Sequence, residues 1–357
     1  MDKIFISGNH TFAEAAIRAG CKCYFGYPIT PQNEIGEYMA TNLRKAGGIF
    51  IQSESETAAI NMVIGASATG VRVMTSSSSP GISLKQEGLS FLAGFELPAV
   101  VVNVMRGGPG LGNIAPAQGD YFQATRGGGH GDYRMPVLAP GTVQEISEVT
   151  TLAFDLADKY RTPVMILGDG MLGQMKEPVV FAEPQKNLPE KEWALRGRGD
   201  GPSRYMASLI LDPAEMERHN WKLDRKFQQI TKNEVRYESY MVDDAEIVII
   251  AYGTTARIAK GAINRVRKEG IKVGLIRPIT LWPFPRGILQ DLARTIKHFI
   301  VFEMSTGQML EDVQLSIMGK AGISFHGRPG GVVPTPAEFA RYIFREYQEK
   351  KDLRYET

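Results

Sequence analysis

The sequence predicts an α/β protein with two domains, the first of them built on a doubly wound parallel β-sheet. One reason is size, because 357 residues, 43% of them hydrophobic and 22% charged, are enough for two domains with substantial cores. Another is the alternation of short apolar runs, stopped by Gly, Pro or Ser, with helix-like stretches. Finally, the runs are apolar throughout, which is typical of parallel strands buried on both faces.

The first domain is expected to span residues 1–175. Thr11 and Glu14 form a capping box that should begin a helix, and Gly20 should end that helix. A further helix is expected at 143–159. Strands are expected at 23–28, 49–53, 71–77, 98–106 and 162–170.

Periodicity weakens over residues 176–242, which hold several prolines and charged segments. This stretch is expected to be a linker or excursion. The alternation resumes at 245–278, which has the pattern of a strand, a helix and a strand, and continues with a strand at 298–305 and a helix from near Leu310. A second, smaller α/β domain is therefore expected at 243–357.

Composition excludes several classes of function. The 41 basic residues nearly balance the 39 acidic ones, and no basic block is interleaved with aromatic residues, so no nucleic-acid or membrane surface is indicated. The N-terminus lacks the pattern of a signal peptide, and no apolar run is long enough to span a membrane. We expect a cytoplasmic protein whose ligands are small molecules or other proteins.

The chain holds two cysteines, Cys21 and Cys23, and their C-x-C spacing supplies too few thiolates for an iron–sulfur cluster or a complete zinc site. Buried free thiols are the expected state. If the protein takes part in redox chemistry, its metal clusters should lie on another chain.

Three glycine-containing motifs suggest ligand sites, and the sequence argues against each. Residues 168–173 match G-x-G-x-x-G after a strand, but the chain then runs toward Pro178, so no helix N-terminus is expected there. The looser match at 110–115 is bracketed by prolines. The turn from Gly253 to Thr255 could bind an anion, although a threonine N-cap is the simpler interpretation.

Gly168-Asp169-Gly170 also matches the first half of the motif that holds magnesium and diphosphate in thiamine diphosphate enzymes. The second half is a pair of asparagines about 25 to 30 residues later, and no Asn-Asn pair occurs in this sequence. If this cofactor is used, its diphosphate end should be bound by another chain.

Two glutamates stand at the head of the helix-like run that follows residue 52. The pattern Ser53-Glu54-Ser55-Glu56 is a capping box with Glu56 at its third helical position, which explains that residue without any further role. Glu54, two residues earlier, should point away from Glu56 and be exposed.

Five segments together resemble the α subunit of 2-oxoacid:ferredoxin oxidoreductases, and most of all the branched-chain type that acts on 3-methyl-2-oxobutanoate (2-ketoisovalerate). They cover nearly the whole chain in the right order: GYPITP (26–31), QSESETAAINMVIGAS (52–67), MTSSSSPGISLKQEG (74–88), NVMRGGPGLGNIAPAQGDY (103–121) and RPITLWPFP (277–285). The resemblance implies a thiamine diphosphate pyrimidine-binding domain followed by a domain like the C-terminal domain of transketolase.

The resemblance also implies partners. A β subunit would carry the diphosphate domain, Mg²⁺ and an iron–sulfur cluster, with γ and ferredoxin-like δ subunits completing the complex. The implied reaction is oxidative decarboxylation of a 2-oxoacid to acyl-coenzyme A, carbon dioxide and reduced ferredoxin.

Site residues follow from the same resemblance. Glu56 would hydrogen-bond N1′ of the aminopyrimidine, and Ala58, Ala59, Ile60 and Val63 could form an apolar surround that helps it share a proton near neutral pH. Thr30 and Arg106 would bind the substrate carboxylate. Pro28, Ser78 and Phe122 would lie near the cofactor. His130 could be a general acid, although a histidine in a glycine-rich loop is more often structural or solvated.

Three alternatives stay open. The same chemistry could act on 2-oxoglutarate or an aryl 2-oxoacid. The chain could belong to a non-oxidative thiamine enzyme of the transketolase type. It could also be a catalytically silent scaffold, in which case Glu56→Gln would leave activity intact.

Overall fold

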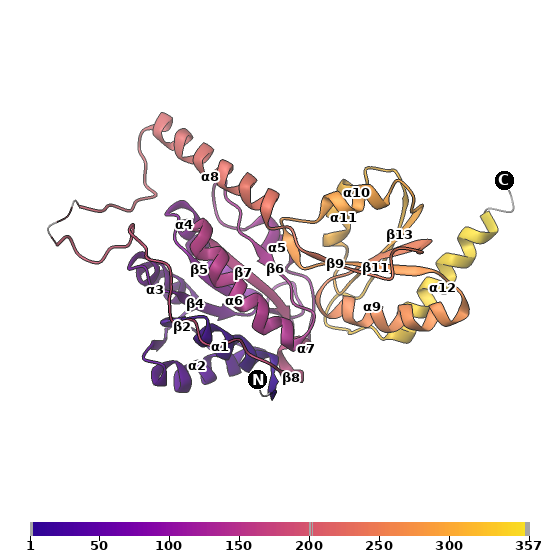
Figure 1. The fold of residues 1–357 in the computed structure, drawn as a ribbon, viewed down its shortest axis with the longest axis horizontal. Coiled ribbons are helices and arrows are strands. Elements are labelled where there is room, and N and C mark those ends of the chain that lie inside the picture. Colours follow the sequence, from indigo (N-terminus) through magenta and orange to yellow (C-terminus); the bar gives the residue numbers. More distant parts are fainter. Residues whose placement is uncertain (1–2, 200, 202, 354–357) are drawn as a thin grey trace.

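The computed structural model describes residues 3–199, 201 and 203–353. Within these residues the strands form one sheet of seven, one of five, and a two-stranded ribbon. Figure 1 shows the two sheets side by side with helices packed against them, and α12 at the far end of the second sheet. The predicted α/β fold class, with a first domain followed by a second, is confirmed.

The first sheet is parallel apart from one edge strand. In spatial order its strands are β12 (Thr280–Trp282), β6 (Val137–Leu138), β7 (Pro163–Asp169), β5 (Ala99–Met105), β4 (Val73–Ser77), β2 (Cys23–Gly26) and β3 (Ile49–Gln52). Only β12 runs antiparallel to its neighbour, β6. The strands expected in the first domain are confirmed as β2, β3, β4, β5 and β7. Strand β12 arrives from the second half of the chain, so residues far apart in sequence complete this sheet.

Helices cover both faces of the first sheet. On one face lie α1 (Gly8–Arg18), α2 (Asn33–Lys45) and α6 (Val143–Tyr160), and on the other lie α3 (Glu56–Ala68) and α4 (Pro80–Gly94). Alternate residues of β5 feed the two cores, with Val100 and Val102 in one and Val101 in the other. This double cover explains why the strand sequences are apolar throughout.

The strand order places a topological switch point between β2 and β4. From β2 the chain goes outward to β3, then crosses back to β4 and continues in the opposite direction to β5 and β7. In open α/β sheets ligands bind outside the carboxyl ends of the strands at such a point. The loops after β2 and β4 flank it.

Two local expectations in the first domain are wrong. Helix α1 begins at Gly8, because Ser7 is its N-cap and accepts a 3.3 Å hydrogen bond from the His10 N–H. Thr11 lies inside the helix and donates its hydroxyl to the Ser7 carbonyl at 2.8 Å. Helix termination at Gly20 is confirmed by its φ of +78°. The second wrong expectation is full burial of β3, an edge strand whose Ile49 is 56% exposed.

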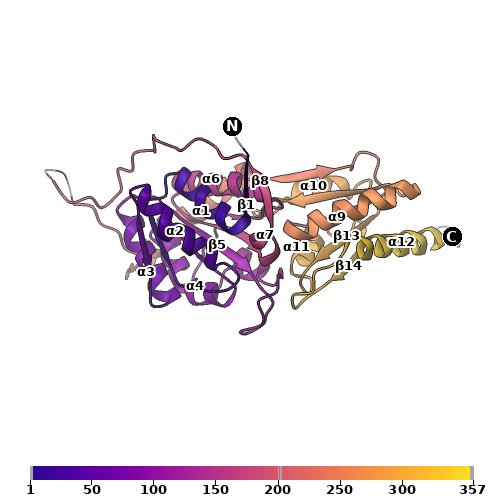
Figure 2. The same cartoon turned by 90° about the horizontal axis from the view of Figure 1, so that it is seen from below.

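Residues 176–242 hold more structure than a linker. Strand β8 (Lys176–Val179) pairs antiparallel with β1 (Ile4–Ser7). The chain then runs as an extended arm around the first domain, where Gln185 and Leu195 donate backbone hydrogen bonds to Arg18 and Ala68 (Figures 1 and 2).

Helix α8 (Pro213–Asn233) follows the arm and is missed by the sequence analysis. Asp212 caps it by accepting from the N–H groups of Ala214 and Glu215 at 2.8 and 2.9 Å. Leu223, Phe227 and Ile230 form its buried stripe. Two features of the sequence indicate this helix: Asp212-Pro213 at its start, and apolar residues four and then three positions apart at 223, 227 and 230.

The second sheet follows the order β14 (Gly322–Gly327), β13 (His298–Glu303), β10 (Ile247–Ile250), β11 (Val273–Pro278) and β9 (Tyr237–Tyr240), with only β9 antiparallel. Helices α9 (Gly253–Val266) and α12 (Pro336–Leu353) pack on one face. On the other face α10 (Arg286–Leu292) and α11 (Gln308–Ile317) share one continuous core with α3 and α4 of the first domain.

Two further expectations can be compared with the structure. Cys21 and Cys23 are free and buried, as expected. Among the described residues, no helix is long and apolar enough to cross a membrane.

Candidate functional site

The sequence-predicted residues converge on the carboxyl edge of the first sheet. The loop after β2 carries Pro28 and Thr30, the start of α3 after β3 carries Glu56, and the turn after β4 carries Ser78. Arg106 directly follows β5. Because these four strands are neighbours in the sheet, the four segments meet around the switch point between β2 and β4.

Arg106 and Thr30 are in direct contact. The Arg106 guanidinium donates a 3.0 Å hydrogen bond to the Thr30 carbonyl and a 2.9 Å bond to the Leu111 carbonyl. Its Nε is buried and makes no hydrogen bond in the structure. Arg106 as a whole residue is 7% exposed. The two carbonyls hold its guanidinium in one orientation, and the Nε–H remains as a donor for an acceptor from outside the chain.

Glu56 is the first residue of α3 and is only 5% exposed. The predicted capping box is wrong, because Ser55 is the N-cap and accepts a 3.1 Å hydrogen bond from the Ala58 N–H. The Ser53 hydroxyl does not cap the helix, because it donates to the carbonyls of Gly26 and Ser55 at 3.1 and 2.8 Å. Glu54 is exposed, as expected.

The surroundings of the Glu56 carboxylate are polar and tightly packed. A Cβ placed on Gly81 of α4 would lie 2.6 Å from Glu56 Oε1 and 2.0 Å from Ser77 Oγ, so only glycine fits there. Of the expected apolar neighbours, Ala59, Ile60 and Val63 are buried along the same helix. The carboxylate itself, however, lies beside Ser77 and the α4 backbone.

Two buried serine hydroxyls at this edge have no hydrogen-bond partner. Ser77 and Ser78 are both fully buried, and neither Oγ is satisfied in the structure. Unsatisfied buried hydroxyls are uncommon and call for an explanation. Together with the Glu56 carboxylate, these hydroxyls are groups of the kind that the ring nitrogens and amino group of an aminopyrimidine need, because that ring both donates and accepts hydrogen bonds.

Sequence reasoning missed the polar group formed by Asp120, Ser79 and Asn103. Ser79 Oγ and Asn103 Nδ2 donate to the Asp120 carboxylate at 2.6 and 3.0 Å. Burial raises the pKa of Asp120, while these two hydrogen bonds and the nearby Arg106 charge act to lower it. Ser79 also accepts the Arg106 N–H at 3.0 Å, so this cluster fixes the backbone of Arg106.

That polar group borders a cleft of about 630 Å³ between the two domains, which is lined also by Ser305 and Gln308. The only available sequence signal was the position of Asp120 in the segment APAQGDY, to which the resemblance attached no role. The cleft puts the site of the first domain next to the loops of the second.

Phe122 and His130 are not gathered into the site. The Phe122 N–H donates to Gln308 Oε1 at 2.7 Å, its ring packs edge-on against Tyr121, and the Arg126 guanidinium lies 5.5 Å from the ring centroid. His130 is exposed in the glycine-rich loop. Phe122 therefore lies at the contact between the domains in this structure.

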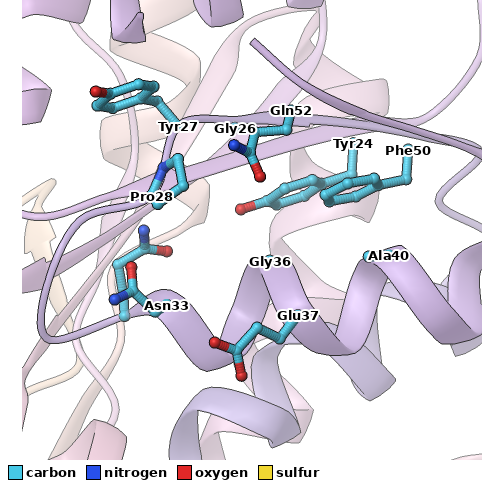
Figure 3. A pocket seen from close by; sticks show the side chains of 11 residues that line it. Tyr24, Gly26, Tyr27, Pro28, Asn33, Gly36, Glu37, Ala40, Phe50 and Gln52 are labelled. Atoms are coloured by element: carbon cyan, nitrogen blue, oxygen red, sulfur yellow. The ribbon is translucent and has the colours of Figure 1, made fainter. Parts of the chain in front are cut away.

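Pro28 borders a smaller pocket on the other side of its loop (Figure 3). This pocket of about 280 Å³ lies between α2, β2 and β3. Its floor is the parallel stack of Tyr24 and Phe50, with centroids 5.7 Å apart. The Tyr24 hydroxyl contacts Ser76 Oγ at 2.6 Å, and Ser76 in turn donates to Gln32 in the pocket wall.

The Gly-Asp-Gly motif at 168–170 is used for structure. A short helix, α7 (Gly170–Gln174), does follow β7, contrary to expectation, but Asp169 caps it by accepting from the Met171 and Leu172 N–H groups at 3.0 and 3.1 Å. Asp169 also accepts from the hydroxyl and N–H of Thr254. It is 2% exposed, and burial raises its pKa.

The contact between Asp169 and Thr254 also bears on the anion site considered for the turn from Gly253 to Thr255, at the start of α9. The N-cap of α9 is Tyr252, so the expected threonine N-cap is wrong. The carboxylate of Asp169 lies at this helix N-terminus instead, and the anion there belongs to the protein itself.

Comparison with known proteins then decides the family. Residues 14–242 match the family model of the thiamine diphosphate-binding part of pyruvate flavodoxin/ferredoxin oxidoreductases, and residues 245–339 match core domain II of pyruvate:ferredoxin oxidoreductase. This chain belongs to the 2-oxoacid:ferredoxin oxidoreductase family. Its first domain is therefore a thiamine diphosphate-binding domain, as the resemblance implied.

Members of the 2-oxoacid:ferredoxin oxidoreductase family with high identity cover nearly the whole chain. Ketoisovalerate oxidoreductase subunit VorB of Methanothermobacter thermautotrophicus is 53% identical over 91% of this chain and 93% of its own. 2-Oxoglutarate synthase subunit KorA of Methanocaldococcus jannaschii is 37% identical over 95% of this chain and 98% of its own. Both relatives are named as subunits, one of a ketoisovalerate oxidoreductase and the other of a 2-oxoglutarate synthase.

Solved structures agree with this family. The 2-oxoglutarate:ferredoxin oxidoreductase of Magnetococcus marinus is similar with a TM-score of 0.86 and 30% identity, over 97% of this chain and 65% of that chain. The present chain thus spans about two thirds of the length of that relative. A split-gene transketolase is similar in fold with a TM-score of 0.59 and 13% identity.

Proposed function

We propose that this chain is the α subunit of a coenzyme A-acylating 2-oxoacid:ferredoxin oxidoreductase that acts on 3-methyl-2-oxobutanoate. The reaction is oxidative decarboxylation to an acyl-coenzyme A, carbon dioxide and reduced ferredoxin. One observation carries the proposal: the same edge of the sheet holds the buried Glu56 carboxylate and Arg106, whose buried Nε has no hydrogen-bond partner. The 53% identity to a ketoisovalerate oxidoreductase subunit supports the branched-chain substrate.

Thiamine diphosphate, when bound, supplies a carbon nucleophile for the 2-oxo carbon and a place for the electrons left by decarboxylation. The Glu56 carboxyl would hold a proton at N1′ of the aminopyrimidine. Its burial at the start of α3 keeps bulk water from competing for that proton. The unsatisfied Ser78 hydroxyl would bind the same ring, and Pro28 would border the loop that encloses it.

Arg106 and Thr30 would hold the substrate carboxylate. The unsatisfied Nε–H of Arg106 offers a charge-assisted hydrogen bond, and the carbonyls of Thr30 and Leu111 keep the guanidinium plane in place. The Thr30 hydroxyl, on an exposed residue of the same loop, is free to donate a second bond. A contact between Phe122 and the pyrimidine stays a prediction, as does a catalytic part for His130.

The chain requires partners for the rest of the chemistry. Asp169, the candidate magnesium ligand, is buried and already accepts four hydrogen bonds, and the two thiols are buried as well. We infer that Mg²⁺, the cofactor diphosphate and an iron–sulfur cluster lie on a β subunit, and that γ and ferredoxin-like δ subunits complete the path to coenzyme A and ferredoxin. The cytoplasmic location stays a prediction.

Coenzyme A-dependent reduction of a low-potential dye by the purified native complex tests the proposal. A panel of 2-oxoacids, with 3-methyl-2-oxobutanoate, 2-oxoglutarate and an aryl 2-oxoacid, identifies the substrate. Glu56→Gln should lower the rate by about 100-fold or more while the complex still assembles, because general acid–base groups contribute about that much. Full activity of an assembled Glu56→Gln complex would sink the pyrimidine role and favour a silent scaffold.

A transketolase-type enzyme makes a different prediction for the same preparation. It would turn over without coenzyme A or an electron acceptor, and its partner would lack cluster-binding cysteines. Metal analysis of the purified complex, with iron absent, would then overturn the oxidoreductase proposal.

A further inference from the structure

Lys85 of α4 is fully buried, at 0% exposure, and no role has yet been given to it. Its ammonium donates to Thr75 Oγ1 at 3.1 Å and to the Glu56 carbonyl at 3.4 Å. Both acceptors are uncharged, and among the described residues the ammonium has no salt bridge to a carboxylate. A buried cation without an ion pair costs several kcal/mol, so a residue such as methionine would pack here at lower cost.

The fold creates this position through two glycines. Gly81 lies one helical turn before Lys85 and Gly88 one turn after it, on the same face of α4. A Cβ on Gly88 would lie 2.5 Å from two Ile60 carbons, and a Cβ on Gly81 would lie 2.6 Å from Glu56 Oε1. The missing side chains let α4 approach α3 closely, and Lys85 passes between them to reach the start of α3.

Glu56 is the charged group that faces Lys85. Burial lowers the pKa of Lys85 to about 8, and the Glu56 charge acts in the opposite direction. From β4 the neighbour is the Thr75 hydroxyl, which does not titrate in this range. The ammonium therefore has one electrostatic partner, and that partner is the carboxylate assigned to the cofactor.

We propose that Lys85 is a positioning residue for Glu56: its ammonium fixes the first turn of α3 through the Glu56 carbonyl and places a positive charge beside the carboxylate. That charge would hold the carboxylate in the orientation in which it contacts N1′ of the aminopyrimidine. The inference rests on the proposed function, because it assigns Lys85 through the role of Glu56. It explains a buried cation that packing alone does not require.

Lys85→Met in the assembled complex is the first test. Methionine preserves the volume and removes the charge, so the rate at pH 7 should fall about 10- to 100-fold, as for other residues that orient a reacting group. In the wild type the rate should fall as the pH rises past about 8, where Lys85 loses its proton. Lys85→Met should lack that fall. Loss of rate with an unchanged pH profile, or no loss at all, would overturn the proposal.

Two further variants keep the test decisive. Lys85→Gln keeps N–H donors but carries no charge, so its rate should lack the fall above about pH 8, as in Lys85→Met, and a wild-type pH profile would contradict the proposal. Lys226→Met is the matched control, because burial also lowers the pKa of Lys226, which pairs with Glu96 at 3.1 Å. It should leave the pH profile of the rate unchanged.

Stability of the isolated chain gives a readout that needs no cofactor. The folded pKa of Lys85, about 8, lies below its ordinary value of 10.5, so the folded chain binds fewer protons than the unfolded chain between these values. Wild-type stability should therefore rise with pH across this window relative to Lys85→Met. Thermal unfolding of both proteins from pH 7 to 10.5 measures it, and parallel curves would show that Lys85 is not a buried cation.

The assays also separate the two proposals. If Glu56→Gln keeps full activity, the pyrimidine role fails and the Lys85 inference fails with it. If Glu56→Gln loses its activity while Lys85→Met keeps the wild-type rate and pH profile, only the Lys85 inference fails.

Discussion

Arg106 and Glu56 are held in different ways by their neighbours. Two backbone carbonyls fix the plane of the Arg106 guanidinium, and Ser79 fixes its backbone N–H. The side chain of Glu56 is positioned by close packing over Gly81. A fixed cation suits recognition of a carboxylate that is the same in every 2-oxoacid, whereas a buried carboxylate free of strong donors can exchange a proton.

Arg106→Lys should weaken substrate binding more than turnover. Lysine keeps the charge but loses the planar fork, so a single ammonium nitrogen must replace the separate nitrogens that now bond the two carbonyls and face the substrate. Losing one charge-assisted hydrogen bond costs about 1.5–3 kcal/mol, so KM for the 2-oxoacid should rise roughly 10- to 100-fold. Steady-state kinetics of the complex measures KM and kcat separately. Arg257→Lys, on an exposed ion pair with Glu177, is the control and should change neither.

Cys21 should not react with thiol reagents in the folded chain. Burial raises the pKa of its thiol to about 12, with the neighbouring Cys23 adding to the effect. At pH 9 roughly 1 thiol in 1,000 would be ionised, and the thiolate is the reactive form. Labelling with iodoacetamide at pH 9 should modify Cys21 only after unfolding in guanidinium. Rapid labelling of Cys21 in the native chain would contradict this.

The contact between α3 and α4 is the element that shapes the site. Glu56 begins α3, the turn with Ser77 and Ser78 leads into α4, and Lys85 lies between the helices. Glycine at positions 81 and 88 permits this approach, since any side chain there would overlap Glu56 or Ile60. The chemistry at the edge of the sheet thus depends on how closely two helices on one of its faces can pack.

Gly81→Ala and Gly88→Ala should both destabilise the chain, by about 1–3 kcal/mol each, because overpacking forces the helices apart. Gly81→Ala should in addition abolish most of the activity, since the new methyl would lie 2.6 Å from Glu56 Oε1 and displace the carboxylate. Chemical denaturation of the chain and the dye assay on the complex measure the two effects. Gly65→Ala is the control on α3, because nothing lies within 4 Å of a Cβ there. It should stabilise the isolated chain by about 0.5–1 kcal/mol.

The two domains are joined by buried polar contacts as well as by a shared core. Gln118 is fully buried in the first domain; its Nε2 donates to the Tyr252 carbonyl at 3.0 Å, and its Oε1 accepts from Met304 N and Thr255 Oγ1 at 3.0 and 3.2 Å. Asp169 reaches the start of α9 in the same region. These contacts place the second domain against the edge of the sheet that holds the site.

Gln118→Ala should weaken the contact between the two domains and lower the free energy of unfolding. It leaves the buried Met304 N–H unsatisfied, while the Tyr252 carbonyl keeps its 2.7 Å hydrogen bond from Thr255 Oγ1. One unsatisfied buried group costs about 1–3 kcal/mol, so we expect a loss of that size in the free energy of unfolding. Guanidinium denaturation of the chain measures it. Gln228→Ala, on the exposed face of α8, should stay within about 0.5 kcal/mol of the wild type.

The sequence by itself determined the strands of the first domain and the positions at which polar residues follow them. Apolar runs mark buried strands through local periodicity, and Thr30, Glu56, Ser78 and Arg106 each come just after one. Since parallel strands end at one edge, these residues had to meet. The missing Asn-Asn pair likewise indicated a second chain for the diphosphate.

Only the tertiary structure decided the partners of those residues. A helix N-cap needs extended backbone and a side-chain oxygen that reaches the first turn, and Ser7 and Ser55 are the residues that meet both conditions, although the sequence patterns placed the caps elsewhere. Contacts such as Lys85 with Glu56 and Asp169 with Thr254 join residues 29 and 85 positions apart, on elements whose approach is set by packing. Local sequence carries no record of such distances, so the surroundings of the site follow from the fold.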